Sequence, residues 1–360
     1  MERKKISKTL KILFTIPTLQ AGGAERVLTT LVNYWAQDDR FEISLLVHDR
    51  DNPFYAVHPA VKITKTPYWK GMRKWVVFFA TYRHLKRQKP DVVVPFILWN
   101  NILTVIAAKL LKIPCLLSER VSPHIVKFPF TWIRNIAYSM AAGIVIQTKR
   151  GALMLPTRMK NKFFIIPNPV LVPPTKASLN SHSIISVGRL TQQKQFPHLI
   201  SAFDRVEKKY KDWTLTIFGE GSDREKLEKL IREKNLTHKI FLPGRVKDLA
   251  SEMVKRSIFV LSSEFEGMPN VLAEAMALGL SVVSTDCPTG PRELIEDGKD
   301  GLLVPVKDVS ALAKAMEQLM KEEALREQLG KRAAQKMTQY SVQKIASLWE
   351  KAWERILESR

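Results

Sequence analysis

The sequence predicts two α/β domains, each a doubly wound parallel sheet with helices on both faces. Two observations support this fold class. Short apolar segments alternate with helical patterns, and this alternation stops near residue 167 and restarts after residue 180. The apolar segments are hydrophobic almost throughout, which is typical of strands covered on both faces. With 360 residues and 45% hydrophobic content, the chain is long enough to build two separate cores.

The expected strands form two sets of five. They cover residues 12–16, 41–47, 91–96, 114–117 and 143–146 in the first half, and residues 183–187, 214–218, 240–241, 258–261 and 281–283 in the second. Between the sets lies the proline-rich segment 167–174, which disfavours helix and central strand and is expected to be an extended linker. We therefore expect a Rossmann-like N-terminal domain over residues 1–169 and a second Rossmann-like domain over residues 170–340.

The last segment, residues 341–360, is predicted to be a helix. Its large apolar side chains recur at helical spacing, namely Ile345, Leu348, Trp349, Trp353 and Leu357. Such a helix should bury one face, and we expect it to pack back on the N-terminal domain.

Composition narrows the functional classes. The chain has no run of about 18 uninterrupted apolar residues, so we expect no transmembrane helix. The basic N-terminus precedes an apolar stretch that is too short for a signal peptide. The two cysteines, Cys115 and Cys287, lack the spacing of a zinc site or a disulfide framework. These features predict a cytoplasmic protein.

The net charge of +22 is unevenly distributed. Residues 1–170 contain 27 Lys and Arg against 9 Asp and Glu, whereas residues 171–360 contain 30 against 26. A surface this basic attracts anionic partners, which include nucleic acid, anionic lipid and phosphate-bearing substrates. The alternative is that the charge only keeps the protein soluble.

Two glycine-containing loops follow expected strands, where open parallel sheets bind their ligands. Gly22 and Gly23 precede a helix whose N-terminal amides can face an anion, although the same pair can form an ordinary turn. They do not fit the G-x-G-x-x-G pattern of dinucleotide-binding domains. In the second domain, Gly188 is followed by Arg189 and Lys194, which can converge on one diphosphate or lie in a solvated turn.

A third loop combines two glutamates with a helix start. Glu266 and Gly267 follow the strand 258–261, and Pro269 suits a first helical turn. Gly279 is placed to end this helix, so that Glu274 lies about two turns beyond Glu266. One carboxylate at the mouth of the helix and one farther along it can bind hydroxyl groups of two different parts of a ligand.

The combination of these three loops resembles family 4 of the retaining glycosyltransferases, which have the GT-B fold. The resemblance extends over essentially the whole chain. It implies two Rossmann-like domains with a cleft between them, in which a sugar is transferred from a nucleotide diphosphate without a cofactor. By this resemblance the catalytic residues are Glu266, Arg189 and Lys194, and the donor-binding residues are Gly22, Gly23, Gly188, Val246, Gly267, Asn270, Val271 and Glu274.

The resemblance also implies individual roles. Arg189 and Lys194 would hold the diphosphate, and Glu266 would bind the transferred sugar. Glu274 would bind the ribose, and the backbone at Val246 would contact the base. Gly22 and Gly23 would lie on the diphosphate side.

Two further segments are similar to a narrower group within the family. Residues 117–123 and 286–294 resemble bacterial members that extend lipid-diphosphate-linked oligosaccharides, including N-acetylgalactosaminyltransferases. This similarity implies a UDP-linked N-acetylhexosamine donor and an undecaprenyl-diphosphate-linked glycan acceptor. Many relatives have a histidine beside the glutamate of the first segment, whereas this chain has Arg120. By the resemblance, Glu119 and Arg120 are expected on the acceptor or donor-sugar side, and the arginine is where this chain departs from those relatives.

A metal site is a competing interpretation. Asp49 and Asp51 form the Asp-x-Asp pattern that binds a divalent ion in the other large glycosyltransferase fold. We interpret this pattern as a chance occurrence and expect no metal, because Arg189, Lys194 and helix amides can balance the diphosphate charge.

Residues 69–89 predict a basic helix with an aromatic face. Such a helix can lie in the headgroup region of an anionic membrane, or it can pack its apolar face inside the domain. The expected membrane surface comprises Arg73, Lys74, Trp75, Phe78, Phe79, Arg83 and Lys86. We expect a peripheral protein on the inner face of the cytoplasmic membrane.

Two other functions fit part of the pattern. A nucleotide-sugar epimerase can share the same fold, and it would consume a sugar nucleotide without an acceptor product. The charge alone also allows a nucleic-acid-binding protein, but the sequence contains no recognisable nucleic-acid-binding module. We therefore expect no nucleic-acid partner.

Overall fold

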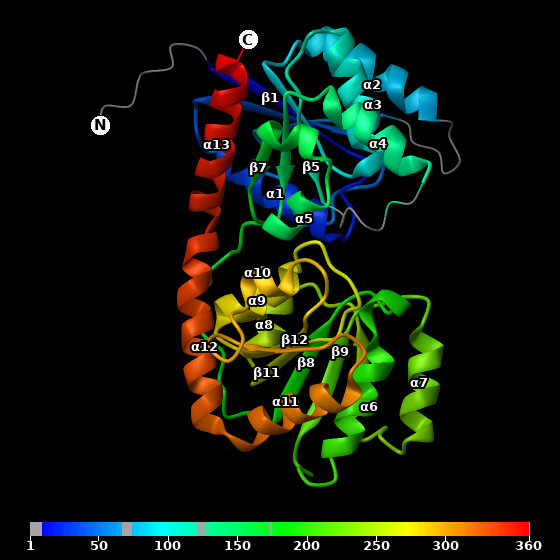
Figure 1. Cartoon of the computed structure of the whole chain (residues 1–360), viewed down its shortest axis with the longest axis vertical. Coiled ribbons are helices and arrows are strands. Elements are labelled where there is room, and N and C mark those ends of the chain that lie inside the picture. The colour runs from blue at the N-terminus through cyan, green and yellow to red at the C-terminus, as the bar shows by residue number, and fades with distance from the viewer. Residues whose placement is uncertain (1–8, 67–73, 121–125, 127, 173–174, 360) are drawn as a thin grey trace. The chain divides into compact units, whose positions relative to one another are not determined.

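The computed structural model describes residues 9–66, 74–120, 126, 128–172 and 175–359. The chain divides into two compact units (Figure 1). The first unit consists of Met1–Pro169 and Val342–Arg360, and the second unit is Val170–Ser341.

The first unit is built on parallel strands. Four of them, β1 (Leu10–Ile16), β2 (Phe41–Val47), β3 (Lys62–Lys65) and β4 (Val92–Pro95), pair in the order β3-β2-β1-β4. Three more, β5 (Leu116–Glu119), β6 (Gly143–Ile146) and β7 (Phe163–Ile165), pair in the order β5-β6-β7. Parallel bridges from Val93 to Cys115 and from Phe96 to Ser118 connect β4 to β5.

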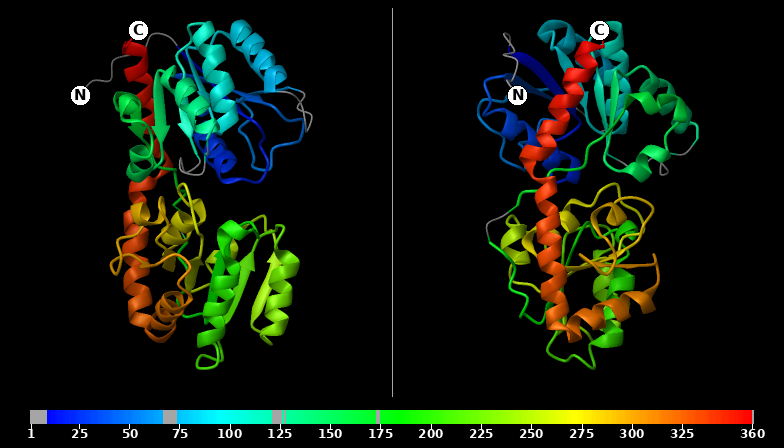
Figure 2. Two further views of the ribbon diagram at one scale, coloured as in Figure 1. Left: turned by 45° about the vertical axis from the view of Figure 1, so that its right-hand side comes forward. Right: turned by 60° about the vertical axis from the view of Figure 1, so that its left-hand side comes forward.

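Helices cover both faces of this sheet. One face carries α1 (Gly23–Trp35) and α13 (Val342–Glu358), and the other carries α2 (Lys74–Gln88), α3 (Leu98–Leu110) and α4 (Phe130–Ser139), as Figures 1 and 2 show. The short helices α5 (Lys149–Leu153) and η2 (Thr157–Lys162) precede β7. Strand β1 serves both layers, because Phe14 packs with α1 and α13 whereas Leu13 packs on the opposite face.

The C-terminal helix α13 contributes to the core of the first unit. Its Trp353 ring lies 4.5 Å from Trp35 and 6.3 Å from Phe14, measured between ring centroids. Trp349 stacks on Phe96 at 6.2 Å. Both helix tryptophans are buried, so α13 closes one side of the sheet.

The second unit repeats the plan with six parallel strands. These are β8 (Ser183–Val187), β9 (Thr214–Phe218), β10 (Ile240–Gly244), β11 (Ile258–Leu261), β12 (Ser281–Thr285) and β13 (Leu302–Val304), in the order β10-β9-β8-β11-β12-β13. The helices are η3 (Gln192–Lys194), α6 (Phe196–Val206), α7 (Arg224–Glu233), α8 (Leu249–Met253), α9 (Asn270–Leu278), α10 (Pro291–Leu294), α11 (Val309–Lys321), α12 (Glu323–Met337) and η4 (Thr338–Tyr340). Their apolar faces form one core on each side of the sheet.

Both sheets reverse their strand order at one point, between β1 and β4 in the first unit and between β8 and β11 in the second. The loops that follow the two neighbouring strands at this point run to opposite faces of the sheet. Doubly wound sheets bind their ligands in the space between these two loops. The prediction of two doubly wound parallel domains is confirmed. The sequence pattern missed β3, β7 and β13, which are short strands of three or four residues with partly exposed side chains.

None of the helices in the described ranges is long and apolar enough to cross a bilayer.

Candidate active site

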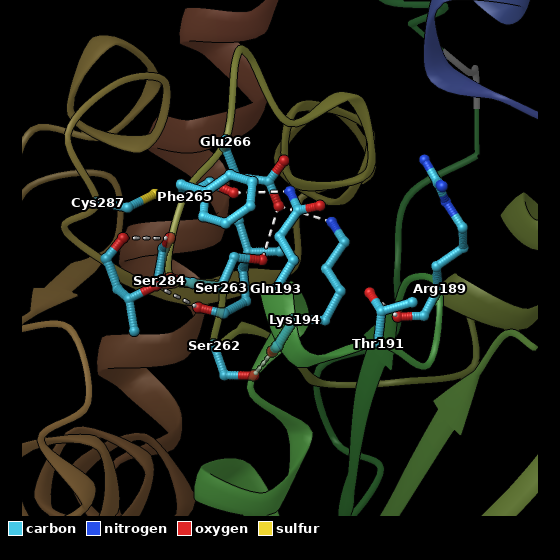
Figure 3. Close-up of polar contacts among 12 residues, drawn as sticks. Arg189, Thr191, Gln193, Lys194, Ser262, Ser263, Phe265, Glu266, Ser284 and Cys287 are labelled. Carbon is cyan, nitrogen blue, oxygen red and sulfur yellow. Dashed lines mark hydrogen bonds and ion pairs between the residues drawn. The ribbon is translucent and has the colours of Figure 1, made fainter. Parts of the chain in front are cut away.

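An ion pair lies where the second sheet reverses its strand order. Lys194, from the loop after β8, places Nζ 2.6 Å from Oε1 of Glu266, from the loop after β11. Their side chains are only 15% and 10% exposed. Figure 3 shows the two side chains pointing toward each other from opposite loops. The structure therefore brings together two of the predicted catalytic residues.

Polar contacts hold Glu266 in place. Ser263 donates from Oγ to Oε1 of Glu266 at 2.7 Å, and the hydroxyl of Thr289 donates to the Glu266 carbonyl oxygen. Gln193 donates from Nε2 to the carbonyl oxygen of Phe265 at 2.8 Å. Both the carboxylate and its backbone are thus fixed by side chains from neighbouring strand ends.

Lys194 is positioned by a glycine beneath it. A Cβ atom on Gly188 would lie 2.9 Å from Cε of Lys194 and 3.1 Å from its Cδ, so only glycine leaves room for this lysine path. Ser262 donates from Oγ to the Lys194 carbonyl oxygen at 2.7 Å. The absence of a side chain at Gly188 therefore leaves space for the Lys194 side chain.

Arg189 does not join this pair. Its side chain is exposed and points away from Lys194 and Glu266 (Figure 3). The expected convergence of Arg189 and Lys194 on one point is therefore not present in this conformation. An arginine at the rim remains able to reach an incoming anion, because its side chain has several rotatable bonds.

The predicted helix after Glu266 is present as α9, and Gly279 ends it with φ +83°. Asn270 and Val271 form its first turn, and Glu274 lies half-buried in the second. The segment before α9 is packed from the side by Gly290, whose Cβ would lie 2.7 Å from the carbonyl oxygen of Gly267.

The loop after β9 belongs to the same site, although sequence reasoning did not select it. Gly219 has φ +142°, and a Cβ there would lie 1.9 Å from the carbonyl oxygen of Gly188. A Cβ on Gly221 would lie 2.3 Å from the carbonyl oxygen of Leu190. The signal that could have found this loop is Gly-Glu-Gly directly after a predicted strand. Val246, the expected contact for the base, lies half-buried after β10.

Cys287 lies in the buried loop after β12. Burial raises the pKa of its thiol to about 12, and the nearby Glu266 carboxylate acts in the same direction. The thiol therefore stays protonated near neutral pH and is unsuited to act as a nucleophile.

In the first unit, Gly22 caps α1 and Gly23 is its first residue. Glu25 folds back over this turn, and its Oε2 lies 2.1 Å from the position that a Cβ on Gly22 would take. Thr18 donates from Oγ1 to Glu25 Oε1 at 3.2 Å. A carboxylate of the chain itself thus lies over the start of this helix.

Glu119 is buried at the carboxyl end of β5. It accepts a hydrogen bond from the Tyr138 hydroxyl at 2.8 Å, and the Arg120 amide donates to its other oxygen at 3.0 Å. Asn101 donates to the Tyr138 oxygen at 3.1 Å. This carboxylate therefore belongs to a network that joins β5, α3 and α4.

Arg120 is bound mainly by neutral groups. It donates to Ser118 Oγ at 2.7 Å and to Asn168 Oδ1 at 2.5 Å, and its guanidinium lies 4.6 Å from the Phe96 ring centroid. Gln147 also donates to Asn168 Oδ1, at 2.7 Å. Burial lowers the pKa of Arg120, and the Glu119 carboxylate opposes that effect. The linker residue Asn168 thus ties the strand ends of the first unit together.

The carboxylates of the Asp-x-Asp pattern accept hydrogen bonds from nearby groups of the same unit. Asp49 Oδ1 accepts from the Arg50 amide at 2.7 Å, and Asp51 Oδ2 accepts from Gln20 Nε2 at 3.3 Å. Among the described residues, no group of three or more His, Cys, Asp or Glu side chains is arranged to hold a metal ion.

The predicted membrane helix is present as α2, although its residues before Lys74, including Arg73, lie outside the described ranges. Trp75 and Phe79 are 56% and 51% exposed. Phe78 is different, because it packs partly buried against the core and stacks on Tyr82. Phe78 therefore differs from Trp75 and Phe79, since its position on the helix turns it partly toward the sheet. Arg83 and Lys86 are exposed.

Comparisons with known proteins agree with this architecture. Residues 21–170 match the family described as Glycosyltransferase Family 4, and residues 173–336 match Glycosyl transferases group 1. A relative from Campylobacter jejuni, a GalNAc-alpha-(1->4)-GalNAc-alpha-(1->3)-diNAcBac-PP-undecaprenol alpha-1,4-N-acetyl-D-galactosaminyltransferase, is 29% identical over 357 residues, which are 95% of this chain and 98% of the relative.

Two solved structures have a similar fold. HepE of Anabaena, in complex with UDP and glucose, has a TM-score of 0.80 at 17% identity and covers 95% of this chain and 98% of its own. Sucrose-phosphate synthase of Thermosynechococcus elongatus has a TM-score of 0.82 at 16% identity, with coverage of 98% and 100%. With its two parallel Rossmann-like sheets and matches that together span residues 21–170 and 173–336, the chain belongs to the glycosyltransferases of the GT-B fold.

Proposed function

We propose that this glycosyltransferase transfers an N-acetylhexosamine, N-acetylgalactosamine in the first instance, from a UDP-sugar to an undecaprenyl-diphosphate-linked oligosaccharide, with retention of the anomeric configuration. The observation that carries the proposal is the ion pair of Lys194 and Glu266 at the β8 and β11 strand ends. The relative from Campylobacter jejuni, whose name describes this kind of transfer, supports the choice of donor and acceptor.

The ion pair suits a diphosphate donor. Lys194 carries a positive charge that the Glu266 carboxylate now neutralises. A diphosphate oxygen of the donor can take the place of this carboxylate. Glu266, released from that contact but still held by Ser263, can accept hydrogen bonds from hydroxyl groups of the sugar. Arg189, at the exposed rim, can add its guanidinium to the same diphosphate. These cations would stabilise the negative charge of the departing UDP.

The remaining donor contacts follow from the same loops. Glu274 on α9 would bind the ribose, and the backbone at Val246 would meet the base. The bond from the anomeric carbon to the diphosphate oxygen breaks, and its electron pair leaves with UDP. The acceptor oxygen bonds to that carbon on the same face, and the acceptor hydroxyl proton passes to the departing diphosphate. The reaction needs no metal in this proposal, because Lys194 and Arg189 balance the charge that a metal would otherwise meet.

The acceptor is assigned to the first unit. Its strand ends carry the network of Glu119 and Arg120, and its helix α2 exposes Lys74, Arg83 and Lys86. An acceptor linked to a lipid diphosphate lies at a membrane surface, which would make the enzyme a peripheral protein of the cytoplasmic face.

A screen of nucleotide sugars tests the donor. A ligand that binds only the folded protein raises its unfolding temperature, so UDP-linked N-acetylhexosamines should stabilise the protein more than GDP- or ADP-linked sugars. The preferred donor is then incubated with an undecaprenyl-diphosphate-linked oligosaccharide, and the product is followed by mass. Gain of one N-acetylhexosamine is expected. Consumption of the sugar nucleotide without a glycosylated acceptor would indicate an epimerase instead.

A further inference from the structure

The first unit exposes a cluster of aromatic and apolar side chains on α2, on α4 and in the turn before α4. Phe128 is 84% exposed, Trp132 64% and Trp75 56%. We call this cluster the aromatic surface; its members are Trp75, Phe79, Phe128, Phe130, Trp132 and Ile136. Exposed apolar clusters of this size on a folded domain are usually contact surfaces.

The two helices that carry the aromatic surface are connected at their N-terminal ends. Lys74 of α2 places Nζ 3.1 Å from the ring centroid of Trp99 in α3 and 5.8 Å from that of Phe130 in α4. Trp99 and Phe130 contact each other edge to face at 5.3 Å. The helices α2, α3 and α4 lie side by side on one face of the sheet in all views (Figures 1 and 2).

The exposure of Trp132 and Ile136 follows from the position of α4. Arg134, Ala137 and Tyr138 of this helix point inward and are buried. Trp132 and Ile136 are four residues apart and therefore lie together on the opposite side of the helix. The outward face of α4 therefore exposes two large apolar side chains, whereas its inward face is already packed in the domain.

The charge around the aromatic surface identifies the partner. Residues 66–169 contain 17 Lys and Arg but only two acidic residues, Asp91 and Glu119. Glu119 is buried, and Asp91 lies before β4, where its carboxylate accepts from the Lys11 amide at 2.9 Å. Helix α2, which carries Trp75 and Phe79, exposes Lys74, Arg83 and Lys86, so two copies of this surface would bring like charges together. Trp and Phe among Lys and Arg are the side chains that prefer the headgroup region of an anionic bilayer.

We propose that the aromatic surface inserts into an anionic lipid bilayer, with Phe128 and Trp132 below the headgroups and the basic side chains of α2 at the lipid phosphates. This deepens the proposed function, on which it rests for its biological meaning, by adding α4 to the basic helix α2. The inward face of α4 carries Tyr138, which donates to Glu119 at 2.8 Å. One helix thus contacts the lipid on one side and the acceptor-side network on the other.

Vesicle sedimentation of the full-length protein tests this surface. Wild type should bind vesicles of phosphatidylcholine with phosphatidylglycerol, and about 0.5 M salt should release only part of it, because inserted rings are not screened. The double variant Phe128→Ala, Trp132→Ala should bind at least tenfold more weakly and be released completely by salt. Phe241→Ala is the matched control, because this exposed phenylalanine lies on β10 of the second unit. It should bind like wild type.

A second measurement locates one ring directly. Bromine-labelled lipids should quench part of the tryptophan fluorescence of wild type, and Trp132→Phe should lose part of that quenching. Equal vesicle binding by wild type and the double variant would overturn the proposal. So would self-association that the double variant abolishes, because the surface would then be a protein interface. These measurements contain no sugar nucleotide, so their outcome is separate from the outcome of the transfer assay.

Discussion

The two units share a strand order around their reversal point, yet they place charge differently at their strand ends. In the second unit, Lys194 and Glu266 form an ion pair across the reversal point. In the first unit, Arg120 is bound by Ser118, Asn168 and an aromatic ring. In the second unit, an anionic ligand can thus replace Glu266 as the partner of Lys194. In the first unit, Arg120 instead connects the end of β5 to the linker through its hydrogen bonds with Ser118 and Asn168.

The two units also differ in the charge and the exposed aromatic side chains of their surfaces. Residues 66–169 of the first unit carry a strong cationic excess together with exposed Trp75 and Trp132. Residues 170–341, the second unit, are nearly balanced, with 26 Lys and Arg against 23 Asp and Glu. Under the two proposals above, the same fold would bind a small anionic ligand in one unit and an extended anionic surface in the other. Four experiments test this difference between the two units.

The largest expected effect concerns the core of the first unit. Trp353→Ala removes a buried ring that contacts Trp35 and Phe14, and such truncations cost about 3–5 kcal/mol. Seven of the eight tryptophans belong to the first unit, so urea unfolding followed by tryptophan fluorescence reports mainly on it. Leu348→Ala, on the exposed side of the same helix, should cost less than about 1 kcal/mol. Similar losses in both variants would contradict the assigned packing.

The next effect concerns the second unit. Glu266→Ala and Arg189→Ala should each reduce transfer by roughly 100-fold, because each removes a group proposed to act on the donor. Glu264→Ala is the matched control, since this neighbouring glutamate pairs with Lys307 and Gln195 instead. It should stay within about threefold of wild type. Unfolding temperatures are measured for all variants, because Glu266→Ala leaves the nearly buried Lys194 without its ion-pair partner and should itself lower stability. Wild-type turnover in Glu266→Ala would remove the site assignment.

A smaller effect is expected from pH in the first unit. His48, buried after β2, lies 2.8 Å from Thr66 Oγ1 through Nδ1, and burial lowers its pKa to about 4, with His84 adding to that effect. The unfolded chain binds this proton near pH 6.5 and the folded chain does not, so stability falls as the pH drops below about 6.5. From pH 7 to 5 the loss is about 2 kcal/mol. His48→Gln should weaken this dependence in urea unfolding, and an unchanged slope would contradict it.

The smallest expected effect is that of a chelator. Transfer by wild type should be the same with and without EDTA, because the proposed donor site balances charge with Lys194 and Arg189. Loss of activity that manganese restores would instead favour Asp49 and Asp51 as metal ligands. The double variant Asp49→Asn, Asp51→Asn separates the two cases, since it should retain activity under this proposal.

Spacing along the chain predicted the long buried strands and the helix after Glu266, because each depends on neighbouring residues. It did not predict that Lys194 pairs with Glu266, since the two lie 72 residues apart. The proline-rich pattern places Asn168 only in a linker. In the structure, its side chain accepts two hydrogen bonds from residues at strand ends. An aromatic run in a sequence also does not say which ring faces the core, and here Phe78 lies partly buried whereas Phe79 is exposed.

The aromatic residues of α4 show the same limit. Trp132 and Ile136 lie four residues apart, a spacing that is typical of one apolar helix face but does not say whether that face is buried. Only the positions of Arg134 and Tyr138 show that the buried face is the other one. A pattern of apolar residues therefore predicts a helix more reliably than it predicts which side of the helix is covered.

The place of α13 has a consequence for how the protein is made. The ribosome completes residues 1–169 long before it adds Trp349 and Trp353, and the whole second unit is synthesised in the interval. Until then, Trp35 and Phe14 lack the rings that cover them in the finished fold. The second unit can fold on its own stretch of chain while the first waits with an uncovered apolar face, which is the kind of surface that chaperones bind. The first unit can therefore complete its core only after the second unit has been synthesised.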